Sequence, residues 1–242
     1  MNKKTQKILI LIATYNEREN LEPLVQRIFE AAPEVSILVV DDNSPDGTGE
    51  VADHLAKKFA AANVIHREGK LGYGTALLSG LRWAEQNGYD AVVTMDADFS
   101  HAPIVLPEMI RMGEEHPVVL GSRYIPGGHT VNWSLRRRLL SWGGNLFARL
   151  MLGIPAHDLT TGFRFLQLDA VRTAHLEKVT ARGYGFLIET IYRIYKSGIH
   201  PAETPITFVD RKAGASKMSR SIVVEALLLV VKLWYEKNFV RK

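Results

Sequence analysis

Apolar positions along the first half of the chain follow two periods in turn, one typical of strands and one typical of helices. Short apolar runs predict strands at residues 7–13, 35–40, 63–66 and 91–95. The stretches between them carry apolar residues at helical spacing and predict helices at residues 20–32, 48–60 and 72–87. Strands that alternate with helices through short connections build a parallel sheet covered by helices on both faces. We therefore expect an α/β fold.

Length and cysteine content narrow the class of protein. The chain of 242 residues is long enough for one large α/β domain, or for a domain with a small appendage. It contains no cysteine, which excludes disulfides and thiolate metal sites and agrees with a reducing compartment. The first residues are basic and then apolar, as in a signal peptide, but the apolar run at 8–13 is short and polar residues follow it. We interpret this run as the first strand.

Positive charge is concentrated in two segments. Residues 116–157 contain five arginines and no acidic residue, and residues 211–242 contain eight lysines and arginines against two glutamates. Such segments attract the phosphates of a nucleotide, a nucleic acid or an anionic membrane. The segments contain no RNA-binding motif in which aromatic residues are interleaved with the charges, and there is no helix-turn-helix or zinc signature. We therefore expect no nucleic-acid partner.

Two carboxylates, Asp96 and Asp98, directly follow the apolar run at residues 91–95. A buried parallel strand delivers ligands at its carboxyl end, and two hard carboxylates suit Mg²⁺ or Mn²⁺. A single Asp-x-Asp pair at a strand end also commonly caps the following turn. Both interpretations stay open for the pair taken alone.

Polar residues follow three of the predicted strands. The first strand leads into residues 14–17, the second into Asp41 and Asp42, and the fourth into the Asp96 and Asp98 pair. In a parallel sheet these ends share one edge, where a tyrosine ring, a base-reading carboxylate and a metal-binding pair can surround one nucleotide. The first strand is not followed by Gly-x-Gly-x-x-Gly, which argues against a dinucleotide-binding dehydrogenase.

Six motifs occur in the order TYNERENL, VVDDNSPDGTG, KLGYGTALLSGL, MDADFSH, GSRY and DLTTGFRF. Together they resemble the inverting family 2 glycosyltransferases of the GT-A fold, and specifically the dolichol-phosphate (polyprenol-phosphate) mannose synthases. The resemblance covers residues 7–217 and implies a GT-A nucleotide-sugar fold, Rossmann-like and mainly parallel, with a catalytic domain at residues 1–217. It implies transfer of mannose from GDP-mannose to dolichyl or polyprenyl phosphate, giving a β-linked product, with Mg²⁺ or Mn²⁺ as cofactor.

The resemblance also assigns the donor and metal residues. The positions that match the guanosine-binding half are Tyr15, Glu17, Val40 and Asp42, and those that match the metal and diphosphate motif are Asp96, Ala97 and Asp98. Ser100 stands at the third metal position of the family, where a hydroxyl is a weaker ligand than a carboxylate. Tyr15 taken alone also fits an ordinary aromatic residue at a sheet edge.

Basic residues match the family's positions around the two reacting phosphates, because two phosphate-bearing reactants must be brought together against their repulsion. The resemblance implies that Arg123, Arg211 and Lys217 bind the donor diphosphate, and that Arg123 and Arg137 bind the acceptor phosphate. With Asp98, these two arginines are the expected catalytic residues. At least one arginine of residues 136–138 is expected on a solvated helix face.

Two further carboxylates have two open interpretations. Asp158 and Glu189 either orient the sugar hydroxyls, or cap helices and pair with arginines. His101 lies beside the metal motif, and we interpret it as a turn histidine.

Two stretches predict amphipathic helices for a membrane surface. No apolar run approaches the ~20 residues of a spanning helix. Apolar residues recur on one helical face at residues 223–235 and again at 139–150, and basic residues follow the former. The alternative is that either face packs on the sheet as ordinary core. We expect residues 218–242 to form an interfacial helix, on a cytoplasmic protein held peripherally at the cytoplasmic face of a membrane, and a membrane-protein partner stays open.

Other functions compete with this interpretation. The same fold could use a UDP-sugar, as in a polyprenyl-phosphate glucose synthase or another family 2 glycosyltransferase. A non-catalytic sugar-nucleotide sensor, or a scaffold for a membrane protein, is a third possibility, against which the intact aspartate pair argues.

Overall fold

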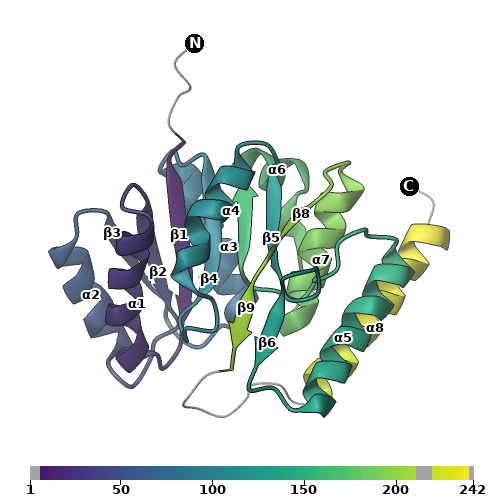
Figure 1. The fold of residues 1–242 in the computed structure, drawn as a ribbon. Helices are drawn as coiled ribbons and strands as arrows, with labels where there is room; N and C mark the ends of the chain where they lie inside the picture. Colours follow the sequence, from purple (N-terminus) through teal and green to yellow (C-terminus); the bar gives the residue numbers. More distant parts are fainter. Residues whose placement is uncertain (1–5, 182, 211–219, 240–242) are drawn as a thin grey trace.

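A seven-stranded sheet forms the middle layer of the molecule in a computed structural model that describes residues 6–181, 183–210 and 220–239 (Figure 1). From one edge to the other, the strands are β3 (Ala62–His66), β2 (Ser36–Asp41), β1 (Ile8–Thr14), β4 (Ala91–Asp96), β7 (Arg164–Gln167), β5 (Val118–Ser122) and β8 (Ala202–Pro205). All pairings are parallel except those of β7, which runs antiparallel to β4 and β5. The expected mainly parallel α/β sheet is confirmed.

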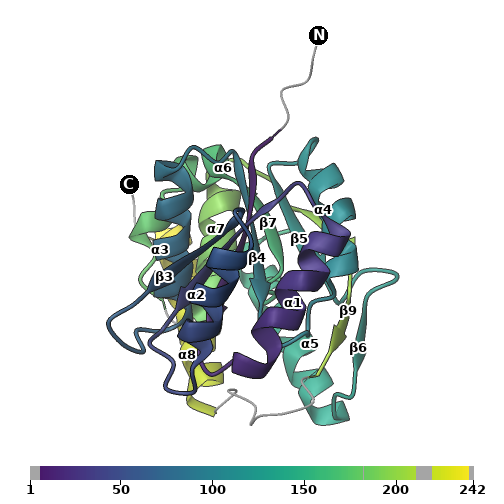
Figure 2. The same cartoon turned by 90° about the vertical axis from the view of Figure 1, so that its left-hand side faces the viewer.

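Helices cover both faces of this sheet, and each face has its own apolar core. One core contains side chains from α1 (Arg18–Ala31), α2 (Thr48–Lys58) and α4 (Leu106–Gly113), which follows the short 3₁₀ helix Pro103–Val105. The other contains side chains from α3 (Tyr73–Gln86), α5 (Leu135–Leu152), α6 (Leu168–Thr173), α7 (Gly183–Lys196) and α8 (Arg220–Phe239), and from the 3₁₀ turn Leu176–Lys178. Figure 2 shows α1 and α4 on the opposite side of the sheet from α3 and α7.

The central strands read as continuous apolar runs because both of their faces are buried. Every residue of β1 from Ile8 to Ile12 is buried, since alternate side chains enter opposite cores. The four strands and three helices predicted for the first half of the chain end within two residues of the observed bounds. The run at residues 8–13 is therefore a core strand, as interpreted.

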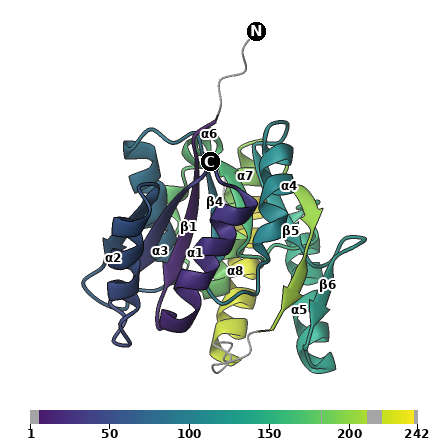
Figure 3. The same cartoon turned by 60° about the vertical axis from the view of Figure 1, so that its left-hand side comes forward.

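A second, two-stranded sheet lies beside the first. Its strands, β6 (His129–Val131) and β9 (Thr207–Val209), are parallel, and Figure 3 shows them next to the start of α5. The main-chain N–H of Asp210 extends this pairing by donating to the Val131 carbonyl at 3.1 Å. The small sheet thus holds the strand that leads into α5 beside the segment that ends at Asp210.

Helices α5 and α8 pack against each other at one side of the molecule (Figure 1). Val230 and Leu233 of α8 are buried, and Lys237 Nζ donates to the Leu152 carbonyl at the end of α5 (2.8 Å). Eleven large apolar side chains of the pair are exposed: Leu135, Leu139, Leu140, Trp142, Leu150, Val224, Leu227, Leu228, Val231, Tyr235 and Phe239. We call these residues the α5–α8 apolar face.

Within the described ranges, none of the helices combines the length and the apolar character needed to cross a bilayer. The proposed boundary between residues 217 and 218 lies outside the described residues.

Candidate active site

The three polar strand ends meet at one edge of the sheet, as predicted. In the parallel register, Thr14 of β1 is level with Asp41 of β2, and Ala13 is level with Asp96 of β4. The carboxyl ends of β1, β2 and β4 therefore present their loops side by side.

Hydrogen bonds join the loops after β1 and β2 into one unit. The Thr14 hydroxyl donates to Asp41 Oδ1 at 2.9 Å, and Asn16 adopts a left-handed φ of 61°, which Asn tolerates better than most residues. Three main-chain N–H groups of the first loop then donate to side chains of the second. These bonds run from Asn16 N to Ser44 Oγ (3.0 Å), from Glu17 N to Thr48 Oγ1 (2.9 Å) and from Arg18 N to Asp46 Oδ2 (3.2 Å).

Asp42 organises a third loop. Its carboxylate pairs with Arg67 and accepts from the main-chain N–H of Gly72 at 2.7 Å. Within the loop that these contacts hold, Lys70 places its ammonium 3.9 Å from the centre of the Tyr15 ring. Tyr15 and Asp42 therefore both contact this basic loop.

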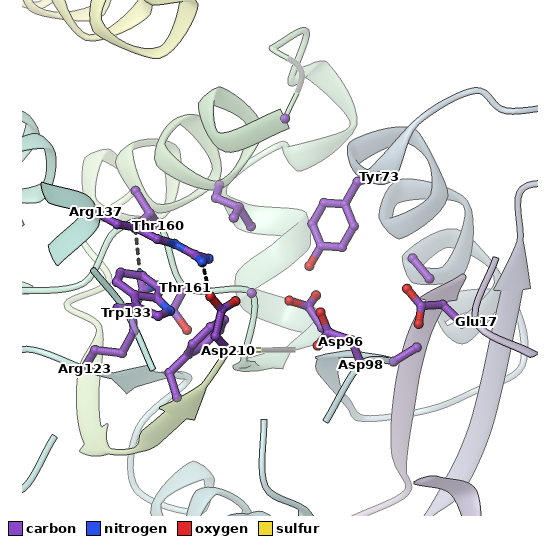
Figure 4. A pocket seen from close by; sticks show the side chains of 16 residues that line it. Glu17, Tyr73, Asp96, Asp98, Arg123, Trp133, Arg137, Thr160, Thr161 and Asp210 are labelled. Carbon is purple, nitrogen blue, oxygen red and sulfur yellow. Dashed lines mark hydrogen bonds and ion pairs between the residues drawn. The ribbon is translucent and has the colours of Figure 1, made fainter. Parts of the chain in front are cut away.

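A cavity of about 290 Å³ opens at the same edge of the sheet (Figure 4). Its charged lining residues are Glu17, Asp96, Asp98, Asp210, Arg123 and Arg137, and its other labelled residues are Tyr73, Trp133, Thr160 and Thr161. Carboxylates and guanidinium groups therefore face one another across a single space.

The cavity brings together six of the predicted site residues: Glu17, Asp96, Ala97, Asp98, Arg123 and Arg137. Tyr15, Val40, Asp42 and Ser100 are not among its lining residues. The Val40 side chain is fully buried in the core, and the buried Ser100 hydroxyl has no hydrogen-bond partner among the described residues. Arg211 and Lys217 lie outside the described residues, so their donor role stays a prediction.

A sharp turn follows Asp98. Phe99 has a left-handed φ of 60°, which is uncommon for a bulky side chain, and the turn brings the Ser100 N–H to Asp98 Oδ1 at 3.1 Å. The two aspartates thus come from a strand end and a constrained turn. Hard oxygen donors in this arrangement fit Mg²⁺ or Mn²⁺.

The protein supplies few side-chain ligands for a metal ion. Among the described residues, no group of three or more His, Asp or Glu side chains is placed to hold a metal ion. A carboxylate pair is nevertheless sufficient for a cation that completes its shell with water and substrate phosphates, as Mg²⁺ commonly does. The chemistry of the pair fits such an ion.

His101 holds the main chain at Asp96 in place. His101 is buried, and its Nδ1 accepts from the Asp96 main-chain N–H at 3.1 Å, while its ring stacks on Phe163 with centres 5.0 Å apart. Burial lowers the pKa of His101, against the opposing effect of the nearby Asp96. The histidine lies in the bend that follows the aspartate pair, in agreement with a turn histidine, and it is buried, where it supports the end of β4.

Tyr73 approaches Asp96 from α3. Burial, and then the charge of Asp96, raise the pKa of the Tyr73 hydroxyl well above its usual value, so that it stays protonated. A phenol held neutral beside a carboxylate is a hydrogen-bond donor at the cavity wall.

Arg123 is tied to a buried carboxylate. Its Nε donates to Asp158 Oδ2 and its Nη2 to Asp158 Oδ1, both at 2.7 Å, and Nη2 also donates to Thr160 Oγ1 at 2.8 Å. Burial alone would raise the pKa of Asp158, but the charge and hydrogen bonds of Arg123 outweigh it and leave the pKa below its usual value. A bidentate pair of this kind fixes the direction of the guanidinium.

Arg137 is held differently. It follows Ser134, the N-cap of α5, and its guanidinium lies 4.2 Å from the centre of the Trp133 ring. Its Nη1 donates to Asp210 Oδ2 at 2.5 Å, and both residues line the cavity (Figure 4). The ion pair is partly exposed, whereas the Arg123 pair is buried.

The two carboxylates with open interpretations both pair with arginines. Asp158 binds Arg123, and Glu189 accepts from Arg193 Nε at 2.9 Å and from the Ala181 N–H at 3.2 Å. Asp158 is fully buried beneath the cavity wall, and Glu189 does not line the cavity.

A family model described as Glycosyl transferase family 2 matches residues 9–173, about two thirds of the sequence. The chain belongs to glycosyl transferase family 2. The family resemblance of the six motifs is confirmed, and the protein is a glycosyltransferase.

Two relatives align with this glycosyltransferase over most of its length. An undecaprenyl-phosphate mannosyltransferase of Micrococcus luteus is 43% identical over 226 residues, which cover 93% of each chain. A polyprenol monophosphomannose synthase of Mycolicibacterium smegmatis is 44% identical over 228 residues, which cover 93% of this chain and 86% of the relative.

Solved structures share the GT-A fold of this glycosyltransferase. Glucosyl-3-phosphoglycerate synthase from Mycobacterium tuberculosis, in complex with Mn²⁺, UDP and glucosyl-3-phosphoglycerate, superposes with a TM-score of 0.66 at 20% identity, over 94% of this chain and 80% of that one. A mannosyltransferase from Pyrobaculum calidifontis, in complex with GDP-Man and Mn²⁺, gives a TM-score of 0.58 at 16% identity, over 98% and 76% of the two chains.

Sequence reasoning missed four residues at the cavity of this glycosyltransferase: Tyr73, Trp133, Phe208 and Asp210. Tyr73 lies within the KLGYGT motif, which carried the resemblance without a role for its tyrosine. Trp133 lies just before α5, four residues from Arg137. Phe208 and Asp210 lie on a segment that the pairing of β6 with β9 brings beside Arg137. No local pattern in the sequence signals that pairing.

Proposed function

We propose that this family 2 glycosyltransferase transfers mannose from GDP-mannose to a polyprenyl phosphate of the dolichyl or undecaprenyl kind. The observation that carries the proposal is the identity of 43–44%, over 93% of the chain, with two enzymes named for mannosyl transfer to polyprenyl phosphates. The reaction would take place at the cytoplasmic face of a membrane, where the acceptor phosphate is presented.

Asp96 and Asp98 would hold a divalent ion, Mg²⁺ or Mn²⁺, together with the donor diphosphate. When bound, the ion supplies positive charge that stabilises the departing nucleoside diphosphate. The Mn²⁺ in complexes of two proteins with the same fold supports this assignment. Asp42 and Tyr15, on the adjoining loops, are proposed for the guanosine half, and Glu17 extends from that side into the cavity.

The acceptor needs no general base. A phosphomonoester has a second pKa near about 6 and is largely a dianion at neutral pH. One of its oxygens forms the bond to C1 of mannose while the bond from C1 to the diphosphate oxygen breaks, and the electron pair leaves with GDP. Attack from the face opposite the leaving group converts an α-linked donor to a β-linked product.

The two arginines of the cavity are proposed to position the phosphates. Both arginines line the cavity, and in this proposal Arg137 binds the acceptor phosphate while Arg123 binds both the acceptor phosphate and the donor diphosphate. Because a bidentate carboxylate already orients Arg123, no further ordering is needed when the reactants arrive.

A lipid acceptor has an apolar path to the site. A second cavity of about 80 Å³ lies between α5 and α8, where Leu140, Leu227 and Val230 contribute apolar walls. Arg123 and Trp133 line both this cavity and the larger one. We propose that the first prenyl units lie between the two helices while the α5–α8 apolar face rests on the membrane surface.

A transfer assay tests the proposal. Purified protein receives radiolabelled GDP-mannose, GDP-glucose or UDP-glucose with polyprenyl phosphate, with or without Mn²⁺, and label is counted in the organic phase. We expect label only from GDP-mannose, its loss on chelation, and its loss in Asp98→Ala. Asp169→Asn, which removes an exposed carboxylate far from the cavity, is the control and should leave transfer unchanged. Transfer of glucose from a UDP-sugar instead would overturn the donor assignment.

A further inference from the structure

The Arg137–Asp210 ion pair lies in the wall of the cavity at the arginine proposed to bind the acceptor phosphate. Asp210 Oδ2 accepts from Arg137 Nη1 at 2.5 Å, and both residues line the cavity into which the reacting phosphates must fit (Figure 4). A carboxylate oxygen on a guanidinium takes the same position as a phosphate oxygen. The contact therefore fills the position that the proposed acceptor phosphate requires.

The ion pair uses only some of the N–H donors of Arg137. Arg137 Nε is buried and has no hydrogen-bond partner among the described residues, and Nη1 is the nitrogen that binds Asp210. Guanidinium groups bind phosphates most strongly through two parallel N–H bonds. Because Asp210 binds Nη1 alone, an incoming phosphate that binds Nη1 and Nη2 together offers Arg137 a better fork than the single oxygen of Asp210.

The backbone of both partners is held independently of the ion pair. The Ser134 hydroxyl accepts from the Arg137 N–H at 3.3 Å, and the Asp210 N–H donates to the Val131 carbonyl at 3.1 Å. The Trp133 ring supports the guanidinium at 4.2 Å. Exchange of Asp210 for another anion can therefore leave the backbone of both residues in place.

We propose that Asp210 is an internal competitor for Arg137, which lowers the affinity of the acceptor site for every phosphate by the same factor. The proposal rests on the proposed function, in which Arg137 binds the acceptor phosphate. A lipid phosphate with a prenyl chain between α5 and α8 retains enough binding energy to displace the carboxylate. Free phosphate does not, and after transfer the carboxylate takes Arg137 back and releases the product.

Binding measurements without a donor test this competition. Titration calorimetry measures the affinity of geranylgeranyl phosphate in detergent micelles, and of inorganic phosphate, for the wild type and for Asp210→Asn. We expect both affinities to rise in the variant by the same factor, about three- to tenfold for a partly exposed pair. Asp210→Glu, which restores the charge, should return both affinities toward the wild-type values.

The direction of the change in phosphate affinity tests the proposal. Weaker binding in Asp210→Asn would mean that Asp210 positions Arg137 for the ligand, and unchanged binding would mean that the pair does not compete; either result overturns the proposal. Arg137→Ala separates this failure from failure of the proposed acceptor site. If geranylgeranyl phosphate binds Arg137→Ala as well as the wild type, Arg137 is not its site, whatever Asp210 does.

Discussion

Gly162 lies where three segments of the site meet. A Cβ atom at this position would lie 2.8 Å from the Tyr73 hydroxyl oxygen and 3.1 Å from Asp96 Oδ1. The loop before β7, helix α3 and the end of β4 therefore meet without room for a methyl group. Since Asp96 belongs to the proposed metal pair, a shift of a few tenths of an ångström there acts on the chemistry.

Gly162→Ala should lower kcat/KM by about tenfold or more, because the added methyl group displaces Asp96 or Tyr73. The loss should be partly restored in the double variant with Tyr73→Phe, which removes the oxygen that the methyl group meets first. Steady-state kinetics of the two single variants and the double variant measure the coupling. Strictly additive losses would show that the clash with Tyr73 is not the cause.

The Arg123–Asp158 pair is the other residue-scale feature with a measurable consequence. Both side chains are buried, and removal of one partner leaves an uncompensated charge. Since the pKa of Asp158 is lower in the folded protein than its ordinary value, ionised Asp158 stabilises the fold. That stabilisation is complete above the unfolded pKa of about 4 and is lost as the pH falls through the folded value.

Asp158→Asn should lower the free energy of unfolding at neutral pH by about 3–5 kcal/mol, because Arg123 stays buried without its carboxylate. Urea denaturation between pH 3.5 and 7 measures this. The wild type should lose stability toward the acid end more steeply than the variant. Parallel pH profiles would contradict a folded pKa below the ordinary value.

At the scale of elements, apolar patterning predicted the bounds of single strands and helices and missed contacts between residues far apart in the sequence. Strands β1 to β4 and helices α1 to α3 each satisfy their pattern within a short window, so their bounds were predictable. The antiparallel direction of β7 depends on its fit between β4 and β5. The Arg123–Asp158 pair joins residues 35 positions apart, and only the folded chain reveals it.

Packing distances between elements depend on glycines at two contacts. A Cβ atom on Gly80 of α3 would lie 2.3 Å from Leu11 Cδ1, and one on Gly113 of α4 would lie 2.3 Å from the Phe165 ring. These helices approach the sheet more closely than a helix with any side chain at these positions could.

Gly80→Ala should therefore lower the free energy of unfolding by about 1–3 kcal/mol through overpacking against Leu11. Gly143→Ala is the matched control, since nothing lies within 4 Å of a Cβ added at that position of α5. There the same substitution should raise stability by up to about 1 kcal/mol, because alanine favours a helix over glycine. Urea denaturation of both variants measures the two changes in the free energy of unfolding, which should have opposite signs. Destabilisation by both substitutions would contradict the packing argument.

At the scale of the whole molecule, exposed apolar surface is unevenly distributed. Among the described residues, 11 of the 14 exposed large apolar side chains belong to the α5–α8 apolar face. The helices have the basic residues Arg136, Arg138 and Lys232 alongside. A concentration of exposed apolar side chains on two packed helices, with basic neighbours, is typical of proteins that bind anionic membranes.

Leu139→Ser and Leu228→Ser should each reduce binding to anionic phospholipid vesicles by about tenfold, since each removes the burial of one leucine in the bilayer interface. Ile104→Ser is the matched control, because Ile104 is 78% exposed but lies on the 3₁₀ helix before α4. Vesicle sedimentation measures the three affinities. Equal losses in all three variants would argue against a specific membrane face.

The reversed direction of β7 has a consequence for how such enzymes diversify. The antiparallel neighbours β5 and β7 end and begin at the same edge of the sheet. Residues 123–163, which connect them, therefore leave the sheet and rejoin it at that edge. That excursion carries Arg123, Trp133, Arg137 and all of α5, yet its length does not affect the register of either strand. Evolution can therefore lengthen, shorten or replace this excursion, and with it the residues proposed to bind the acceptor, while the strands that lead to Asp42, Asp96 and Asp98 keep their form.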